Sequence, residues 1–224
     1  MSADSAAEAP AWFGSAARGM AVLPLLMAVY LVFYAAWWPF AWGVPGGVAF
    51  AVAGALAVWA TVRGVHQLRH ARSFPSVPSA AGARVGRAMG VLNSVTHPLW
   101  MSASIVLLLS GHGRGVLPVM VFVIGAHFVP MAFILRRRID LLLGPIAMAF
   151  AAAAGVLALD REVGWLVVFG VAGLGGALAT GAYAVYMSAA YARLCAAAKV
   201  SFAPGTRRPS TPTPVSTPAS RLRS

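Results

Sequence analysis

Cysteine and acidic residues are scarce in this chain of 224 residues. Cys195 is the only cysteine, so no disulfide can form within the chain. Five Asp and Glu residues stand against 17 Lys and Arg residues, and charged residues make up only 10% of the sequence. The sequence contains no HExxH, G-x-S-x-G or P-loop motif, so the residue sets common to hydrolases and nucleotide-using enzymes are missing. The sequence therefore gives no basis for predicting an enzyme.

Apolar residues dominate instead, and they are collected in long segments. Hydrophobic residues supply 60% of the chain and the mean hydropathy is +0.79, far above what a soluble domain of this size needs. Six apolar stretches can be marked, at about residues 20–42, 44–62, 89–110, 116–135, 141–159 and 163–192. Each is close to the roughly 20 residues that a helix needs to cross a bilayer, and the period-2 alternation of a membrane barrel is missing. We predict an all-α polytopic membrane protein with a bundle of six transmembrane helices.

The first two stretches are separated only by residues 37–47, which combine three tryptophans with prolines and glycines. Indole rings suit the headgroup zone, and Pro and Gly interrupt helices. This composition predicts a tight turn at the membrane interface between two spans. A single broken segment is the alternative, because Pro is tolerated inside membrane helices.

The positions of the basic residues predict the orientation. If the N-terminus is cytoplasmic, 15 of the 17 Lys and Arg residues fall on the cytoplasmic side, and only Arg114 and Arg161 fall outside. This asymmetry sets membrane topology, so both termini are expected to be cytoplasmic. We divide the chain into a short N-terminal tail (1–18), a membrane domain (19–192) and a disordered basic tail rich in Pro, Ser and Thr (193–224). The Ala/Val/Arg-rich composition suggests a bacterial inner-membrane protein.

The net charge of +12 also bears on binding partners. The basic residues lie at span ends and in the tail, and no separate soluble domain presents them, so nucleic acid is not an expected partner. The expected partners are the lipid bilayer and anionic headgroups, which the basic loop at residues 63–87 and the basic tail would contact.

Two histidines are expected at the same depth in neighbouring spans. His97 is ten residues from Arg87, and His127 is nine from Arg136, which places each roughly 14–15 Å inside the same membrane face. Ionisable groups at such depth are costly and are functional candidates by default. We predict that both rings face the bundle interior and each other.

Three further polar residues join the candidate binding or proton-handling set. Asn93 shares a helix face with His97, Tyr183 in the sixth span lies at similar depth, and Tyr30 offers a hydroxyl in the first span. These groups could move protons or a small solute through a cavity beside His97 and His127. The alternatives are a non-catalytic scaffold or partner subunit, and a bis-histidine haem or metal protein. No cofactor or metal is predicted, since two histidines cannot fix a closed zinc site and no CxxCH motif is present.

His66 and His70 are spaced as i, i+4, which would place two rings on one helix face as metal ligands require. Arginines surround them, and cationic neighbours oppose a bound cation. A solvated basic face is therefore the preferred interpretation.

Two structural patterns remain. Gly173, Ala177 and Gly181 form a small-residue ladder, which suggests close helix packing within the chain or, as the alternative, a homodimer seam. Asp140 lies at a span end, where pairing with Arg138 is expected.

The segment at residues 125–132 reads Gly-Ala-His-Phe-Val-Pro-Met-Ala and is followed by an arginine cluster. It resembles a group of small uncharacterised bacterial multi-pass membrane proteins that carry a G-x-H-F-x-P-x-A helix. The resemblance implies six helices in the cytoplasmic membrane, and it implies no activity. His127, with Gly125, Phe128 and Pro130, maps onto this motif, whereas His97 depends on the depth argument alone.

Overall fold

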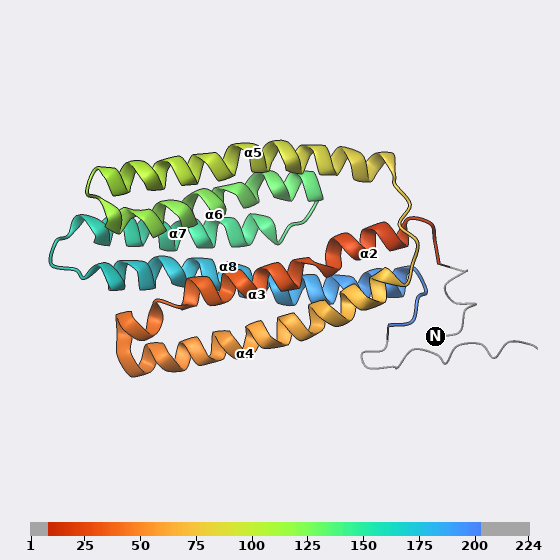
Figure 1. The fold of residues 1–224 in the computed structure, drawn as a ribbon, viewed down its shortest axis with the longest axis horizontal. Coiled ribbons are helices and arrows are strands. Elements are labelled where there is room, and N and C mark those ends of the chain that lie inside the picture. Colours follow the sequence, from red (N-terminus) through yellow and green to blue (C-terminus); the bar gives the residue numbers. More distant parts are fainter. Residues whose placement is uncertain (1–8, 203–224) are drawn as a thin grey trace, which may run out of the picture.

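The computed structural model describes residues 9–202 (Figure 1). Within that range the fold is all-α, with seven α-helices, one short 3-10 helix and no strand. The elements are α2 (Phe13–Ala21), α3 (Leu23–Ala35), α4 (Trp38–Arg72), α5 (Ala80–Leu109), η1 (Gly113–Gly115), α6 (Val116–Leu135), α7 (Asp140–Leu159) and α8 (Trp165–Ala197). Because α2 and α3 follow one another as a single candidate span, six segments are long and apolar enough to cross a membrane. The predicted six-helix membrane fold is confirmed.

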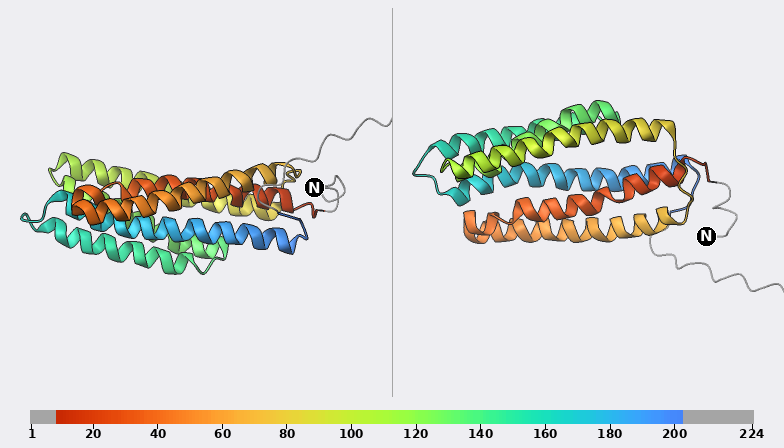
Figure 2. Two further views of the ribbon diagram at one scale, coloured as in Figure 1. Left: turned by 90° about the horizontal axis from the view of Figure 1, so that it is seen from below. Right: turned by 45° about the horizontal axis from the view of Figure 1, so that its top comes forward.

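Helix α8 is the centre of the bundle. It packs against α2, α3, α4, α6 and α7, whereas α5 lies at the edge and, among the described elements, contacts only α6 and η1. Figures 1 and 2 show the spans lying side by side along one long axis, and in the view of Figure 1 α5 and α4 lie at opposite margins. The edge position of α5 leaves most of its side chains exposed.

Glycines in α8 allow α3 to approach its backbone closely. A Cβ atom on Gly173 would lie 2.3 Å from the backbone oxygen of Tyr34, and one on Gly176 would overlap the Tyr34 ring. Gly181 has more room, since a Cβ there would lie 3.2 Å from the end of the Leu56 side chain and 3.6 Å from that of Leu31. Gly173, Ala177 and Gly181 are all buried, so the predicted small-residue ladder packs inside the chain, and the homodimer seam considered as the alternative stays a prediction.

The turn between α3 and α4 differs in detail from the prediction. The first two apolar stretches form two spans and not one broken segment, but α4 already begins at Trp38. Gly43 then interrupts α4 with φ 59° and ψ −130°, a conformation that glycine tolerates and other residues avoid. Ala41 and Trp42 near the start of α4 pack against Gly170 of α8, so residues that the composition assigned to the turn belong to a packed helix.

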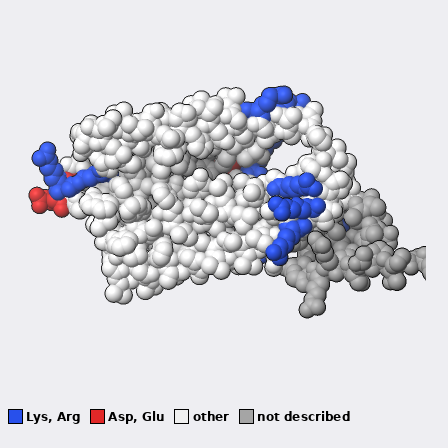
Figure 3. Space-filling view, in the orientation of Figure 1, with Lys and Arg blue, Asp and Glu red and all other residues white. Residues whose placement is uncertain are grey.

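One end of the bundle carries most of the positive charge. The first and last described residues lie at this end (Figure 1), and Figure 3 shows most Lys and Arg side chains gathered there. Its basic residues are Arg18, Arg63, Arg69, Arg72, Arg84, Arg87, Arg136, Arg137, Arg138, Arg193 and Lys199. We call it the basic end.

A second apolar core lies at the basic end, separate from the main core between the spans. Its buried members are Phe13, Ala17, Ala21, Ala71, Phe74, Tyr191, Cys195, Ala198 and Val200. Helix α8 continues to Ala197, and residues 198–202 pack on this core, so the tail boundary predicted at residue 193 is too early. The predicted disorder of residues 203–224 lies outside the described residues.

His70 belongs to this second core and not to a solvated face. Its Nδ1 lies 2.7 Å from the Tyr191 hydroxyl, and its Nε2 donates to the Ser201 backbone oxygen at 3.0 Å. The rings of Phe74 and Phe202 lie edge-on to the imidazole, with centroids 5.2 and 4.9 Å away. The expectation of a solvated basic face is therefore wrong for His70, because the C-terminal segment returns to cover it.

Candidate functional site

The structure places the two membrane histidines at one depth. His127 Nδ1 lies 2.9 Å from Thr96 Oγ1, one residue before His97. The Thr96 hydroxyl proton is used in a hydrogen bond to the Leu92 carbonyl at 2.9 Å, so His127 Nδ1–H is the donor to Thr96. This bond connects α5 to α6 and fixes their register.

His97 does not face the bundle interior as predicted. Its side chain is exposed, and its Nδ1 donates to the Asn93 carbonyl of its own helix at 3.0 Å. No hydrogen bond joins its ring to that of His127 in residues 9–202. Adjacent helical residues differ by about 100° in direction, so Thr96 takes the position facing α6 and His97 is turned away. Asn93 is exposed as well.

The two tyrosines of the predicted set lie elsewhere. Tyr183 is buried, and its hydroxyl accepts a hydrogen bond from Arg137 Nη1 at 2.7 Å. Tyr30 is exposed and stacks on Tyr34, with ring centroids 6.3 Å apart. The five predicted residues therefore do not form one site.

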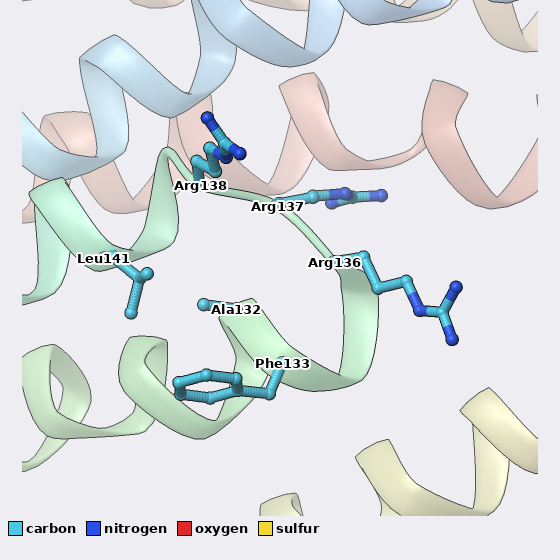
Figure 4. Close-up of a pocket in the computed structure, with 6 residues that line it drawn as sticks. All are labelled: Ala132, Phe133, Arg136, Arg137, Arg138 and Leu141. Atoms are coloured by element: carbon cyan, nitrogen blue, oxygen red, sulfur yellow. The ribbon is translucent and has the colours of Figure 1, made fainter.

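The turn between α6 and α7 carries three consecutive arginines, Arg136, Arg137 and Arg138, which we call the arginine turn. Arg136 takes the left-handed conformation with φ 54° and ψ 44°, which ends α6. The backbone N–H of Arg137 then donates to the backbone carbonyl of Ala132 at 3.0 Å, which closes the turn. Figure 4 shows the three side chains extending from the turn in different directions, away from Leu141 and Phe133.

A pocket of about 400 Å³ lies beside this turn. Its walls combine cationic and apolar side chains (Figure 4): Ala132, Phe133, Arg136, Arg137, Arg138 and Leu141. Phe133 is 71% exposed and Leu141 is 44% exposed, so the apolar wall is open to the surroundings of the bundle. None of the five residues predicted from the sequence lines this pocket.

The three arginines differ in how they are held. Arg137 is half-buried and donates to the Tyr183 hydroxyl and, at 3.4 Å, to the sulfur of Met187. Arg136 and Arg138 are exposed. The structure therefore fixes one guanidinium group and leaves the other two accessible.

Asp140 begins α7 directly after the turn and is fully buried. Neither of its carboxylate oxygens has a hydrogen-bond partner within residues 9–202. The expected pairing with Arg138 is wrong, because no ion pair joins these two residues in the structure.

This arrangement suits an anion. Guanidinium groups present planar donors that match phosphate and carboxylate oxygens. The structure shows no cluster of three or more His, Cys, Asp or Glu residues in residues 9–202 that could hold a metal ion. Sequence reasoning treated the arginines only as a topology signal, and the run of three within one short turn was the signal that could have identified them.

Comparisons with protein-family models, curated proteins and solved structures find no match to this chain. The resemblance of residues 125–132 to small multi-pass proteins therefore stays a prediction. In the structure Gly125 of this segment packs on α7, where a Cβ would lie 3.0 Å from the Gly144 carbonyl oxygen.

Proposed function

We propose that this chain is a multi-pass protein of the cytoplasmic membrane that binds the phosphate group of an anionic lipid at the arginine turn, on the cytoplasmic side. The observation that carries the proposal is the pocket itself, whose lining residues include the three arginines of the turn and the exposed apolar residues Phe133 and Leu141. A phosphate group with an attached hydrocarbon chain matches both halves of that lining.

The position of the arginine turn along the bundle supports this assignment. Arg87 is nine residues before Thr96, and Arg136 is nine residues after His127. Because Thr96 and His127 are hydrogen-bonded, Arg87 and Arg136 lie at one level. Arginines accumulate where a span meets the cytoplasmic headgroups, so this level corresponds to the membrane surface. Within the basic end, α2, α5 and α8 extend further along the bundle axis than the α6–α7 turn does (Figure 1).

The chemistry of the lining favours a lipid over a soluble anion. Arg136 and Arg138 can both reach an outside ligand, since each is exposed. Phe133 and Leu141 would contact an acyl chain and remove apolar surface from the headgroup region. Free phosphate could use the arginines, but it would gain nothing from the apolar wall.

Proton or solute transport at His97 and His127 has weaker support. The bond between Thr96 and His127 is sufficient as a link between two helices, and such bonds need no ligand. Neither histidine lines the pocket. No observation within the described residues favours a bis-histidine haem or metal site. A scaffold or partner subunit is the alternative that remains, and it does not require lipid at the arginine turn.

A lipid-binding titration tests the proposal. The purified protein is reconstituted in nanodiscs or micelles of neutral phosphatidylcholine and titrated with phosphatidylglycerol. The double variant Arg136→Gln/Arg138→Gln should lose about 2 kcal/mol of binding free energy, at about 1 kcal/mol per arginine near the surface, which is roughly a 30-fold rise in Kd. Arg84→Gln/Arg87→Gln is the matched control, because it also removes two exposed arginines at the basic end, and neither lines the pocket.

Inorganic phosphate as a competitor separates the two sources of the anion. We expect millimolar phosphate to leave phosphatidylglycerol bound. Displacement by free phosphate would assign the site to a soluble anion. Equal loss of affinity in Arg84→Gln/Arg87→Gln and in Arg136→Gln/Arg138→Gln would contradict a localised site and indicate general surface attraction.

A further inference from the structure

We propose that α5 pairs with α5 of a second copy of this chain, through the face that carries Gly90, Asn93 and His97. Two observations carry this inference. Polar groups on that face have no partner although they lie at membrane depth, and the residues on the face are spaced like those along a contact between two helices. The inference does not depend on lipid binding at the arginine turn.

Helix α5 is the least packed span of the bundle. Among the described elements it contacts only α6 and η1, and the buried share of its apolar window, 11%, is the smallest among the six spans. In the view of Figure 3 the surface is hollowed below α5. A Cβ atom on Gly86 or on Gly90 would meet nothing within 4 Å. Another helix can therefore approach the α5 backbone closely at these glycines.

The circumference of α5 divides into three faces. Thr96 faces α6, to which its hydroxyl is bonded. Val95 and Leu99 are 61% and 54% exposed and suit contact with acyl chains. Successive residues of a helix differ by about 100° in direction, so residues two apart point about 160° from each other. Asn93 and His97 therefore face away from Val95 and Leu99, on a third face that is neither packed on α6 nor apolar.

This third face carries polar groups without partners. Within residues 9–202 the Asn93 amide makes no hydrogen bond, and the His97 ring bonds only through Nδ1, to the Asn93 carbonyl. Counted from Arg87, Asn93 lies about 9 Å and His97 about 15 Å inside the membrane face, where acyl chains offer no donor or acceptor. Ser104 lies seven residues beyond His97 on the same face; it is only 7% exposed, and its Oγ has no partner in the described part of the chain. A protein partner would satisfy groups that lipid cannot.

The spacing along the third face is that of a seam between two helices. Its exposed residues follow one another at intervals of three, four, three and four: Ala83, Gly86, Gly90, Asn93 and His97. A repeat that averages 3.5 residues keeps one line of side chains against a partner helix in a left-handed pair. The first three residues are small, which permits close approach of the backbones, and neither Arg84 nor Arg87 falls in the series. The occupant that fits this seam is a helix.

A second copy of the chain supplies a complementary helix. Two copies in one membrane share one orientation, so each seam residue meets its counterpart at the same depth across a two-fold axis. An amide carries both donors and an acceptor, so Asn93 can pair with Asn93 of the second copy, and a further amide hydrogen remains for Nε2 of His97. A single Asn in such a seam also fixes the register and the number of helices.

Cysteine crosslinking compares two neighbouring positions on α5. In a Cys195→Ala background, the full-length protein is reconstituted in phosphatidylcholine liposomes at a low protein-to-lipid ratio and oxidised with copper phenanthroline. Gly90→Cys should give a covalent dimer. Val91→Cys, one residue away and about 100° around the helix at a position that is 67% exposed, is the matched control and should stay monomeric. Equal crosslinking at the two positions would contradict the seam.

The dimer equilibrium gives a second measurement that keeps Cys195. Energy transfer between labelled copies of the wild-type protein in the same liposomes should report a dimer. Gly90→Leu should abolish it without unfolding the chain, because a Cβ at Gly90 meets nothing within 4 Å, and Val91→Leu should behave like wild type. Asn93→Leu should raise the Kd of the dimer roughly 3- to 30-fold, as expected for the loss of an interhelical hydrogen bond. A wild type that is monomeric at every protein-to-lipid ratio, a dimer that persists in Gly90→Leu, or an unchanged Kd in Asn93→Leu would overturn the proposal.

Discussion

Replacing Gly173 by alanine should destabilise the bundle, because this glycine is where α3 and α8 approach most directly through their backbones. The added Cβ would lie 2.3 Å from the backbone oxygen of Tyr34 and 3.5 Å from the Trp38 indole nitrogen. Ordinary van der Waals contact begins near 3.4 Å, so α3 and α8 would have to separate by about 1 Å. A backbone oxygen cannot rotate away as a flexible side chain can.

The expected magnitude follows from two opposing effects. Overpacking a tight contact costs typically 1–3 kcal/mol, and the gain in helix propensity from Gly to Ala offsets about 1 kcal/mol at most. A contact with fixed backbone belongs at the upper end of the overpacking range, so we expect a net loss of about 1–2 kcal/mol. Displacement of α3 would also disturb the packing of Tyr34 on Gly176.

Equilibrium unfolding in mixed detergent micelles provides the assay. Gly155→Ala is the matched control, since it lies within α7 and a Cβ there would meet nothing within 4 Å. It should be neutral or slightly stabilising. A Gly173→Ala protein as stable as the Gly155→Ala control would show that α3 and α8 do not pack as described.

Three further outcomes are expected. In a cysteine-free background, Arg72→Cys should react with an impermeant thiol reagent from the cytoplasm and Arg114→Cys from outside, and the reverse pattern would contradict the orientation. Thr96→Val should lower the free energy of unfolding by about 0.6–2 kcal/mol, because it removes the hydrogen bond to His127 that joins α5 to α6; an unchanged value would show that this bond adds nothing. Phe202→Ala should speed proteolysis at the C-terminal end of α8, and an unchanged cleavage rate would show that the ring does not hold this segment.

The sequence predicted those parts of the fold that depend on one chain segment at a time. Hydropathy located six spans because each span must be apolar by itself. Counting residues from the basic span ends placed His97 and His127 at one depth, and the bond between Thr96 and His127 agrees with that register. The ladder of small residues in α8 indicated close packing, although its partner, Tyr34, could be known only from the tertiary structure.

The candidate site depends on how helices are rotated about their axes, which residue counting does not give. One residue separates Thr96, which faces α6, from His97, which is exposed. Depth made Tyr183 a candidate partner of the histidines, but its hydroxyl accepts a hydrogen bond from Arg137 instead. The extension of α8 to Ala197 and the packing of Phe202 at the basic end were missed, because Arg193 was taken as the end of the span, although most residues from Leu194 to Phe202 are apolar.

Photo-crosslinking tests the central claim most directly. A phosphatidylglycerol analogue with a photoreactive group on its acyl chain, near the headgroup, is incorporated into nanodiscs with the wild-type protein, and the labelled peptides are identified by mass spectrometry. The account predicts preferential labelling of the segment around Phe133 and Leu141, and loss of that label in Arg136→Gln/Arg138→Gln. Labelling spread evenly over the lipid-facing helices, or unchanged in the double variant, would contradict a lipid site at the arginine turn.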